Sequence, residues 1–177
     1  KEDSIHHYGA MTYPIYQTAT YAHPGVGQST GYDYSRLQNP TKEHLEKTVA
    51  SLENGIDALA FSSGMAAITL MMELFKPGDH LIVDADLYGG SIRLFNHVSE
   101  KNGIEFSSVD CYKENVAGYI RENTKAVYIE TPTNPMMNVT DIKALAEITK
   151  EHNLLLIIDN TFLSPYFQNP LDLGADI

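Results

Sequence analysis

The stretch 126–158 reads AVYIETPTNPMMNVTDIKALAEITKEHNLLLII, and it decides the fold. It contains two short apolar runs, Ala126–Glu130 and Leu154–Ile158, which have the length and composition of buried strands. Between them, Thr140–His152 is long enough for a helix and is polar on one side. A strand, a helix and a second strand in this order predict a crossover unit with parallel strands.

The same alternation extends towards the amino terminus. Further strands are predicted at Asp57–Phe61, His80–Asp84 and Ile104–Val109, and further helices at Met65–Lys76, Ser91–Asn102 and Glu114–Glu122. An earlier helix is predicted from Thr41, which serves as its N-cap, to Gly55, which closes it. The sequence therefore predicts an α/β fold, with a mostly parallel sheet and helices on both faces.

Residues 1–40 differ from the rest because they show no sustained period and are rich in Tyr, Gly, Pro, Thr and His. We interpret them as an extended arm that needs a partner surface. The run Gly25–Gly31 resembles a dinucleotide-binding glycine motif, but its spacing differs by one residue and no strand precedes it. A nucleotide site is therefore not predicted there.

Bulk composition excludes several classes of partner. The 177 residues carry a formal net charge of −11, which disfavours nucleic acid because both would be negatively charged. The longest aliphatic run, Leu154–Ile158, is too short to cross a bilayer. Cys111 is the single cysteine, so an internal disulfide is impossible. With no apolar leader at its start, the chain is expected to be cytoplasmic.

Ligands of open α/β sheets bind beyond the carboxyl ends of the strands. After the first predicted strand, Ser62–Ala67 forms a turn of small residues and begins a helix, so its free amides and the helix dipole suit a phosphate. A tight connection that merely needs small residues would have the same sequence.

Other strand ends carry polar or aromatic groups. Asp159 ends the most apolar strand, where a carboxylate needs a partner such as a protonated ring nitrogen, or else caps the next turn. Tyr88 precedes Gly89-Gly90, which would let a flat cofactor stack on its ring, although half-buried packing is the alternative. Asn134, between two prolines, either donates to a ring oxygen or satisfies its own loop.

Competing catalytic sites find little support. The seven histidines show no metal-ligand spacing, so no metal is predicted. Ser62 and Ser63 lack the G-x-S-x-G elbow of a hydrolase.

At these residues the sequence resembles the Cys/Met-metabolism family of pyridoxal-phosphate enzymes. That family includes cystathionine γ-synthase, the cystathionine γ- and β-lyases, methionine γ-lyase and the O-acylhomoserine sulfhydrylases. The resemblance runs in order through seven segments: Tyr32–Arg36, Asn39–Thr41, Ser62–Ala67, Tyr88–Gly90, Glu130–Pro135, Asp159–Thr161 and Leu173–Ile177. It implies a fold-type-I structure, like that of aspartate aminotransferase.

The resemblance implies pyridoxal 5'-phosphate as the cofactor and assigns a role to each residue. Gly64 and Met65 are expected to donate amides to the phosphate, Tyr88 to stack on the ring and Asp159 to pair with the ring nitrogen. Asn134 is expected to contact the ring's phenolic oxygen. Glu130 and Thr161 are expected to support the ring's surroundings.

The resemblance also implies a homo-oligomer, a tetramer built from dimers with shared active sites. Tyr34 and Arg36 are expected to reach the cofactor phosphate of a neighbouring subunit, Arg36 because its guanidinium is permanently charged and can bind phosphate through two nitrogens. Tyr88 and Tyr34 are candidate catalytic residues that assist at the amino or leaving group. The domain interpretation is an arm at 1–40, then at 41–177 the first part of the cofactor-binding domain.

The family's Schiff-base lysine and its substrate-carboxylate arginine are expected beyond Ile177, so the chain is interpreted as an amino-terminal fragment. The implied activity is β/γ-elimination or γ-replacement on a small amino-acid substrate.

Gly90 stands where methionine γ-lyases often carry cysteine, and the segments 88–95 and 160–165 resemble the synthases more closely. A synthase or sulfhydrylase is therefore favoured over a lyase. Two other classes stay open: an aminotransferase, which the Tyr34–Arg36 segment disfavours, and a non-catalytic fragment that binds phosphate or a partner.

Overall fold

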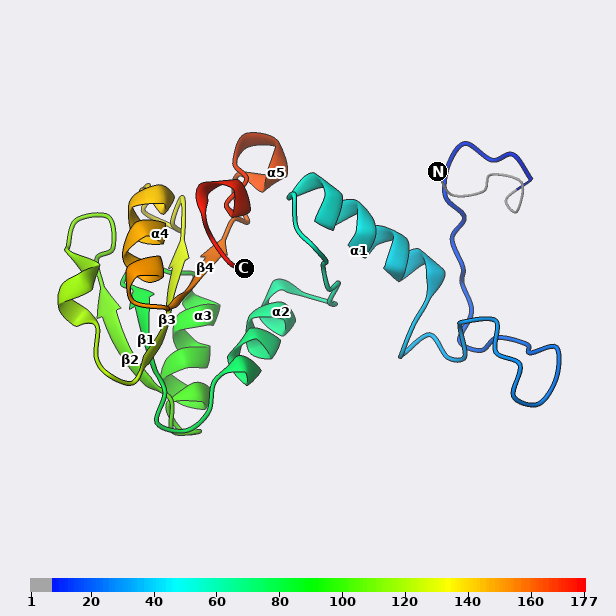
Figure 1. Cartoon of the computed structure of the whole chain (residues 1–177), viewed down its shortest axis with the longest axis horizontal. Coiled ribbons are helices and arrows are strands. Elements are labelled where there is room, and N and C mark those ends of the chain that lie inside the picture. Colours follow the sequence, from blue (N-terminus) through cyan, green and yellow to red (C-terminus); the bar gives the residue numbers. More distant parts are fainter. Residues whose placement is uncertain (1–7) are drawn as a thin grey trace. The chain divides into compact units, whose positions relative to one another are not determined.

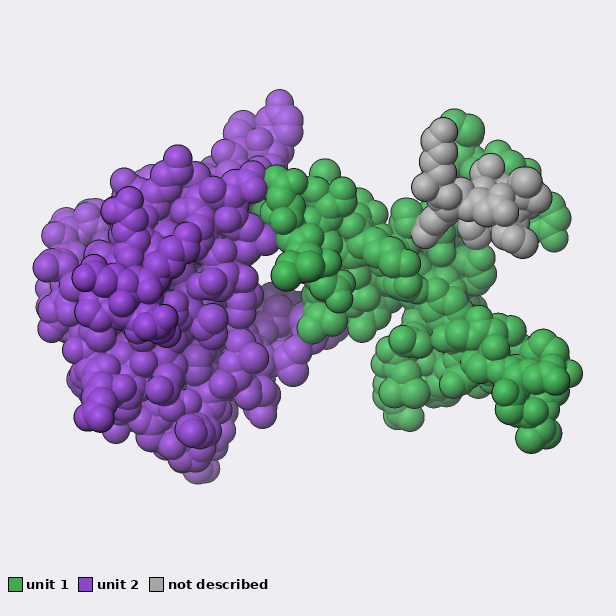
Figure 2. All heavy atoms as spheres, viewed as in Figure 1, with its two compact units in different colours: residues 1–60 green, residues 61–177 purple. Residues whose placement is uncertain are grey.

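A computed structural model describes residues 8–177, which fall into two compact units (Figure 2). The first unit ends at residue 60, and the second comprises residues 61–177. The helix α1 (Pro40–Leu52) belongs to the first unit, and an α/β sheet with its helices forms the second. The domain boundary that was expected after residue 40 stays a prediction.

The sheet of the second unit has four parallel strands in the order β2-β1-β3-β4 (Figure 1). Their bounds are β1 His80–Asp84, β2 Glu105–Val109, β3 Thr124–Glu130 and β4 Leu155–Asp159. The register pairs Ala126 with Leu155 and runs on until Glu130 pairs with Asp159. The predicted parallel sheet is confirmed, and four of its five predicted strands form.

Alternate strand residues face two separate hydrophobic cores. On one face Ile82, Val127 and Leu156 pack with Leu145 and Ala146 of α4 (Ile142–Glu151). On the other face Leu81, Tyr128 and Ile157 pack with Phe95, which follows α3 (Gly89–Leu94). Because both faces are covered, the central strands β1 and β3 are buried along almost their whole length, as expected for a parallel sheet, whereas the edge strand β2 is mostly polar.

Side chains cap α1, α4 and the helix at residues 64–71, whereas α3 and the short helix at residues 164–167 begin without a side-chain cap. Asp141 caps α4 by accepting the N–H of Ala144. The remaining elements of the second unit are α2 Gly64–Met71, the 3₁₀ turns η2 Met72–Leu74, η4 Val116–Tyr119 and η5 Leu171–Leu173, the π-helical η3 Phe95–Ser99, and α5 Ser164–Phe167.

The strand that was predicted at Asp57–Phe61 does not form, so this prediction is wrong. In the described part of the chain no strand pairs with this segment. Its amides instead reach side chains, since Ala58 donates to Asp57 and Ala60 donates to Glu46. An apolar run needs a neighbouring strand to complete its ladder, and this is a non-local requirement that composition does not reveal.

Two helix predictions also need correction. The helix α1 is capped by Asn39 rather than Thr41, because Asn39 Oδ1 accepts the N–H groups of Thr41 and Lys42 and Pro40 occupies the first helical position. The helix predicted over 114–122 shrinks to η4, whose centre contains Gly118, a poor helix former.

The described part of the arm is held partly on α1. Tyr16 donates its backbone N–H to Thr41 Oγ1 at 2.8 Å, and Asn39 Nδ2 donates to the carbonyl of Tyr16. The ring of Tyr13 stacks on His44 with centroids 4.0 Å apart. Many apolar side chains of the arm nevertheless remain exposed, among them Tyr8, Met11, Ile15, Val26 and Leu37.

The helix α2 is apolar but buries none of its residues. Leu70, on α2, and its flanking residues Phe61 and Leu74 are among the exposed large hydrophobic residues. An apolar helix face of this kind ordinarily packs against another surface. Among residues 8–177, no helix combines the length and apolar character that a bilayer crossing requires.

His80 ties three strands together at the amino end of the sheet. Its side chain is fully buried, with Nδ1 2.8 Å from Thr124 Oγ1 on β3 and Nε2 2.9 Å from Ser107 Oγ on β2. Burial lowers the pKa of His80, and the nearby Arg121 guanidinium lowers it further. The ring is therefore held neutral in the folded state.

This arrangement predicts acid sensitivity of the fold. The pKa of His80 is lower in the folded than in the unfolded protein, so the unfolded state binds more protons as the pH falls through 6.5, the ordinary value. We expect the intact protein to lose more stability between pH 8 and pH 5 than its His80→Gln variant, measured by urea unfolding. The exposed His152→Gln variant is the control and should behave as wild type. Equal losses in wild type and His80→Gln would contradict the expectation.

Candidate active site

Three neighbouring strands end in carboxylates at one edge of the sheet, which we call the carboxyl edge. They are Asp84 of β1, Glu130 of β3 and Asp159 of β4. Asp84 and Glu130 are only 1% and 5% exposed. Burial raises the pKa of Asp84 to about 6 and also raises that of Glu130, to which Asp159 adds by repulsion. A cationic group beside this edge would stabilise the ionised forms of Asp84 and Glu130.

A cavity of about 250 Å³ lies between α2 and the end of β4. Its polar lining includes Asp159, Asn160 and Thr161, and its apolar walls come from Ile157 and several α2 residues, beginning at Gly64. The Ser63 hydroxyl caps α2 by accepting the N–H of Ala66. The amides of Gly64 and Met65, in the first turn, have no acceptor within the helix, so an anion can accept them.

Asp159 is held by donors from two elements. Its Oδ2 accepts the Tyr128 hydroxyl at 3.3 Å, while Oδ1 accepts the backbone N–H of Thr161 at 3.2 Å and the Thr161 hydroxyl at 2.5 Å. These bonds fix the orientation of the carboxylate. Oδ2, which accepts only the Tyr128 hydroxyl, keeps acceptor capacity for a further donor from the cavity.

Tyr88 and Glu130 are joined across the site. The backbone N–H of Tyr88 donates to Glu130 Oε2 at 2.8 Å, so the buried Glu130 fixes the loop that carries the tyrosine. The ring of Tyr88 lies over Gly90, because a Cβ atom there would stand 2.4 Å from Tyr88 Cε1 and 2.8 Å from Met65 Sδ. The ring itself is 45% exposed and offers a surface for stacking.

Asp86 clamps this loop to the loop after β3. Its Oδ2 accepts the Thr133 hydroxyl at 2.5 Å and the side-chain amide of Asn138 at 3.1 Å. Asn134 lies half-buried within the clamped loop, and its backbone amide offsets part of the rise in the pKa of Glu130. The loops that follow β1 and β3 therefore form one hydrogen-bonded assembly.

Two predicted residues, Tyr34 and Arg36, lie in the first compact unit. The guanidinium of Arg36 lies over the ring of Tyr34, 5.1 Å from its centroid. Both side chains are exposed, so they present a cation and a hydroxyl to solvent. Their expected role at a neighbouring subunit stays a prediction.

Sequence reasoning missed Tyr128, Ser63 and Asp86. Ser63 directly before an apolar helix is an ordinary N-cap signal and could have been found. Tyr128 and Asp86 act across the sheet or between loops, so only the register of the strands reveals their partners.

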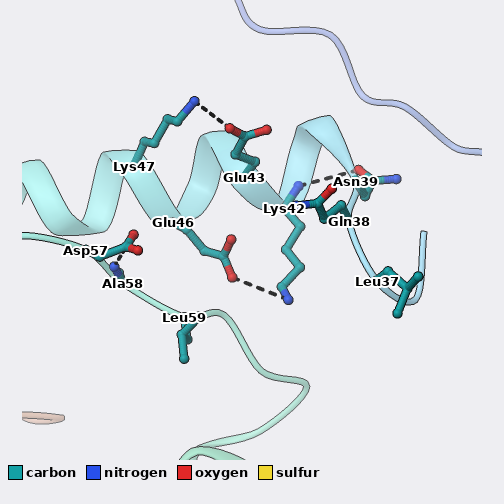
Figure 3. A pocket seen from close by; sticks show the side chains of 10 residues that line it. All are labelled: Leu37, Gln38, Asn39, Lys42, Glu43, Glu46, Lys47, Asp57, Ala58 and Leu59. Carbon is teal, nitrogen blue, oxygen red and sulfur yellow. Dashed lines mark hydrogen bonds and ion pairs between the residues drawn. The ribbon is translucent and has the colours of Figure 1, made fainter. Parts of the chain in front are cut away.

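A second cavity, of about 260 Å³, lies between α1 and residues 57–59 of the first unit (Figure 3). Its charged groups neutralise one another along the helix, with Lys42 3.4 Å from Glu46 and Lys47 2.6 Å from Glu43. It therefore presents no concentrated charge to a ligand. Within residues 8–177, no group of three or more His, Cys, Asp or Glu side chains is arranged to hold a metal ion.

The site has the features of a pyridoxal-phosphate enzyme of fold type I: a helix start for a phosphate, an exposed aromatic ring and a carboxylate at the edge of a parallel sheet. Comparison with known proteins agrees. The profile of the Cys/Met metabolism PLP-dependent enzyme family matches residues 1–177. The chain belongs to this family, and both the resemblance and the fold class predicted from the sequence are confirmed.

Similar proteins carry several activities in their names. The chain is 53% identical to the cystathionine gamma-synthase/O-acetylhomoserine (thiol)-lyase of Bacillus subtilis and 54% identical to the cystathionine gamma-lyase of the same organism, each over 96% of the chain. It spans 46% and 45% of their lengths, about half. A solved structure of cystathionine gamma-lyase from Lactobacillus plantarum complexed with L-serine matches with a TM-score of 0.91 and 47% identity, covering 97% of this chain and 45% of the other.

Pyridoxal phosphate is the cofactor of this family, and the residues at the site fit it. The first turn of α2 offers backbone N–H groups for a phosphate. Asp159 supplies an anion with spare acceptor capacity for a protonated ring nitrogen, and the apolar wall formed by Ile157 and Ile158 suits the ring itself.

The contact between Gly90 and Tyr88 generates a prediction. In the intact protein, Gly90→Ala should displace the Tyr88 ring and cost about 1–3 kcal/mol of stability, as overpacking usually does. Gly89→Ala is the matched control, because its new Cβ would meet only Arg93 Nη1, at an ordinary 3.5 Å. The comparison is made by thermal unfolding. A Gly90→Ala protein as stable as Gly89→Ala would show that the ring does not rest on Gly90.

Proposed function

We propose that this chain supplies the cofactor-binding half of an active site for pyridoxal-phosphate chemistry on sulfur amino acids. The single observation that carries the proposal is the cavity that holds Asp159 together with the start of α2. It offers a carboxylate for a ring nitrogen and backbone amides for a phosphate within one space. Membership of the Cys/Met metabolism family supports this use of the cavity.

Each site residue then has a defined task. The amides of Gly64 and Met65 bind the phosphate, and the carboxylate of Asp159 holds the ring nitrogen protonated. Tyr88 stacks on the ring, supported from behind by the bond between its N–H and Glu130. The Asn134 side chain donates to the phenolic oxygen, and Thr161 keeps Asp159 in place.

The bound cofactor supplies an electron sink that stabilises negative charge on the α-carbon of an amino acid. The chain's own residues orient the ring and control protons. Tyr88, with its exposed ring and hydroxyl, is placed to move a proton at the amino group or the leaving group, and Tyr34 of a neighbouring subunit is the second candidate for this task.

Among the activities of the family, we favour γ-replacement by a cystathionine γ-synthase or O-acylhomoserine sulfhydrylase. Gly90, and the resemblance of segments 88–95 and 160–165 to the synthases, support this choice. Cleavage of a C–S bond by a cystathionine γ- or β-lyase is the second candidate, because the two Bacillus subtilis relatives are almost equally similar to this chain. Methionine γ-lyase is disfavoured by Gly90.

The choice is tested by assaying the intact protein with two substrate sets. An O-acylhomoserine with cysteine or sulfide should be converted faster than cystathionine is cleaved. Faster cleavage of cystathionine would reverse the assignment. A protein that develops no visible cofactor absorbance with pyridoxal phosphate would overturn the proposal in favour of a non-catalytic binding fragment.

Replacing Asp159 tests the pairing with the ring nitrogen. In the intact enzyme, Asp159→Asn should reduce turnover at least about tenfold while leaving folding nearly normal, because an amide lacks the charge that keeps the nitrogen protonated. Asp141→Asn is the matched control: it makes the same chemical change at an exposed helix cap, where asparagine serves equally well. Turnover close to wild type in Asp159→Asn would refute the assignment.

We further propose that the enzyme is a homo-oligomer, a tetramer built from dimers in which active sites are shared. The exposed arm residues, and the exposed pair of Tyr34 and Arg36, support this arrangement. Apolar side chains that stay in water within one subunit are stabilised when a second subunit covers them. Arg36 would then neutralise the cofactor phosphate of the neighbour.

Subunit mixing tests the shared site. The Arg36→Ala and Asp159→Asn proteins should each have at most about a tenth of wild-type activity alone. After subunit exchange, a hybrid pair collects both defects in one site and leaves the other intact, so about a quarter of wild-type activity should return at equal mixing. Verified hybrids that recover no activity would show that Arg36 does not serve its neighbour.

A further inference from the structure

Tyr128 is a core residue whose hydroxyl faces the candidate site. It lies on β3, is 2% exposed, and packs edge-on against Phe95 with ring centroids 5.3 Å apart. Its neighbours in this core are apolar, among them Leu81 and Ile157. A hydroxyl in such surroundings is costly unless it makes a hydrogen bond. Phenylalanine would fill the same space without that cost.

The hydroxyl makes its bond to Asp159. The register pairs Tyr128 with Ile157 and Glu130 with Asp159, so Tyr128 and Asp159 are diagonal neighbours on one face of the sheet. Tyr128 Oη lies 3.3 Å from Asp159 Oδ2, and both residues line the cavity at the start of α2. Tyr128 thus contacts the carboxylate from the core, on β3, while Thr161 contacts its other oxygen from the following turn.

The direction of this bond is fixed. Burial raises the pKa of Tyr128 far above its usual value, and the negative charge of Asp159 raises it further. The hydroxyl therefore stays protonated over the working pH range and donates, and the Asp159 carboxylate accepts. A hydrogen bond to a carboxylate is directional and so fixes how the group is oriented.

We propose that Tyr128 is a positioning residue that holds the Asp159 carboxylate directed into the cavity, and thereby sets how well the carboxylate meets the cofactor's ring nitrogen. The inference rests on the proposed function and adds to it the residue that orients the partner of the ring nitrogen. Without the hydroxyl, Oδ2 of Asp159 loses its donor on the core side, and the carboxylate can turn away from the cavity. A carboxylate that is less well directed holds the ring nitrogen less fully protonated.

The test uses the intact protein reconstituted with pyridoxal phosphate that is labelled with ¹⁵N in the ring. The chemical shift of the nitrogen reports its protonation directly, and dialysis against known cofactor concentrations gives the dissociation constant. In Tyr128→Phe we expect the nitrogen signal to move towards that of unprotonated pyridine. We also expect cofactor binding to weaken by about tenfold, in the range of one hydrogen bond to a charged group.

A matched control removes the same type of bond elsewhere. The Tyr119 hydroxyl donates to the carboxylate of Glu114 at the protein surface, and Tyr119→Phe deletes it. This variant should keep the wild-type nitrogen signal and cofactor affinity. Thermal unfolding of both variants is recorded as well, since a purely structural role would change stability but leave the nitrogen signal unchanged.

The outcomes separate this inference from the proposed function. A wild-type protein that binds no pyridoxal phosphate overturns the proposed function and this inference together. A wild-type protein with a protonated nitrogen, and a Tyr128→Phe variant with the same signal and affinity, overturn the inference alone. A shifted signal in Tyr128→Phe but not in Tyr119→Phe supports it.

Discussion

Parallel pairing in register brings carboxylates together at the carboxyl edge. The hydrogen bonds of the site compensate for the repulsion between these carboxylates. Glu130 and Asp159 stand opposite each other because β3 and β4 pair without a shift. Two anions side by side repel, and partial burial strengthens the repulsion. Each is therefore supplied with donors, a backbone N–H for Glu130 and two hydroxyls with a backbone N–H for Asp159.

These donors also connect the elements that would otherwise be independent loops. The bond to Glu130 fixes the turn before α3, and the bonds to Asp86 tie that turn to the loop after β3. The hydrogen bonds that these carboxylates accept thus also make the loops rigid where a ligand would bind. A site whose groups are already oriented does not have to order them on binding, which preserves affinity.

Sequence patterns were sufficient where the structure is local. The strand His80–Asp84 was predicted with its observed bounds, since a short apolar run between a turn and a polar end has few alternatives. The segment 57–61 has a similar composition, but the prediction that it forms a strand was wrong, because strand pairing depends on a partner that lies far away in the sequence. For the site, strand ends pointed to Glu130 and Asp159. The contribution of Tyr128 depends on a diagonal relation between two strands, which a linear pattern does not encode.

The uncovered apolar surface of α2 bears on how this polypeptide can be handled. Leu70 projects from a helix that buries no residue of its own, and the exposed Phe61 and Leu74 flank this helix in the sequence. In water such a surface attracts other exposed hydrophobic groups, including those of identical chains. Preparations of the 177-residue polypeptide by itself should accordingly tend to self-associate. Detergent would be the natural means to keep it dispersed for crystallisation or spectroscopy.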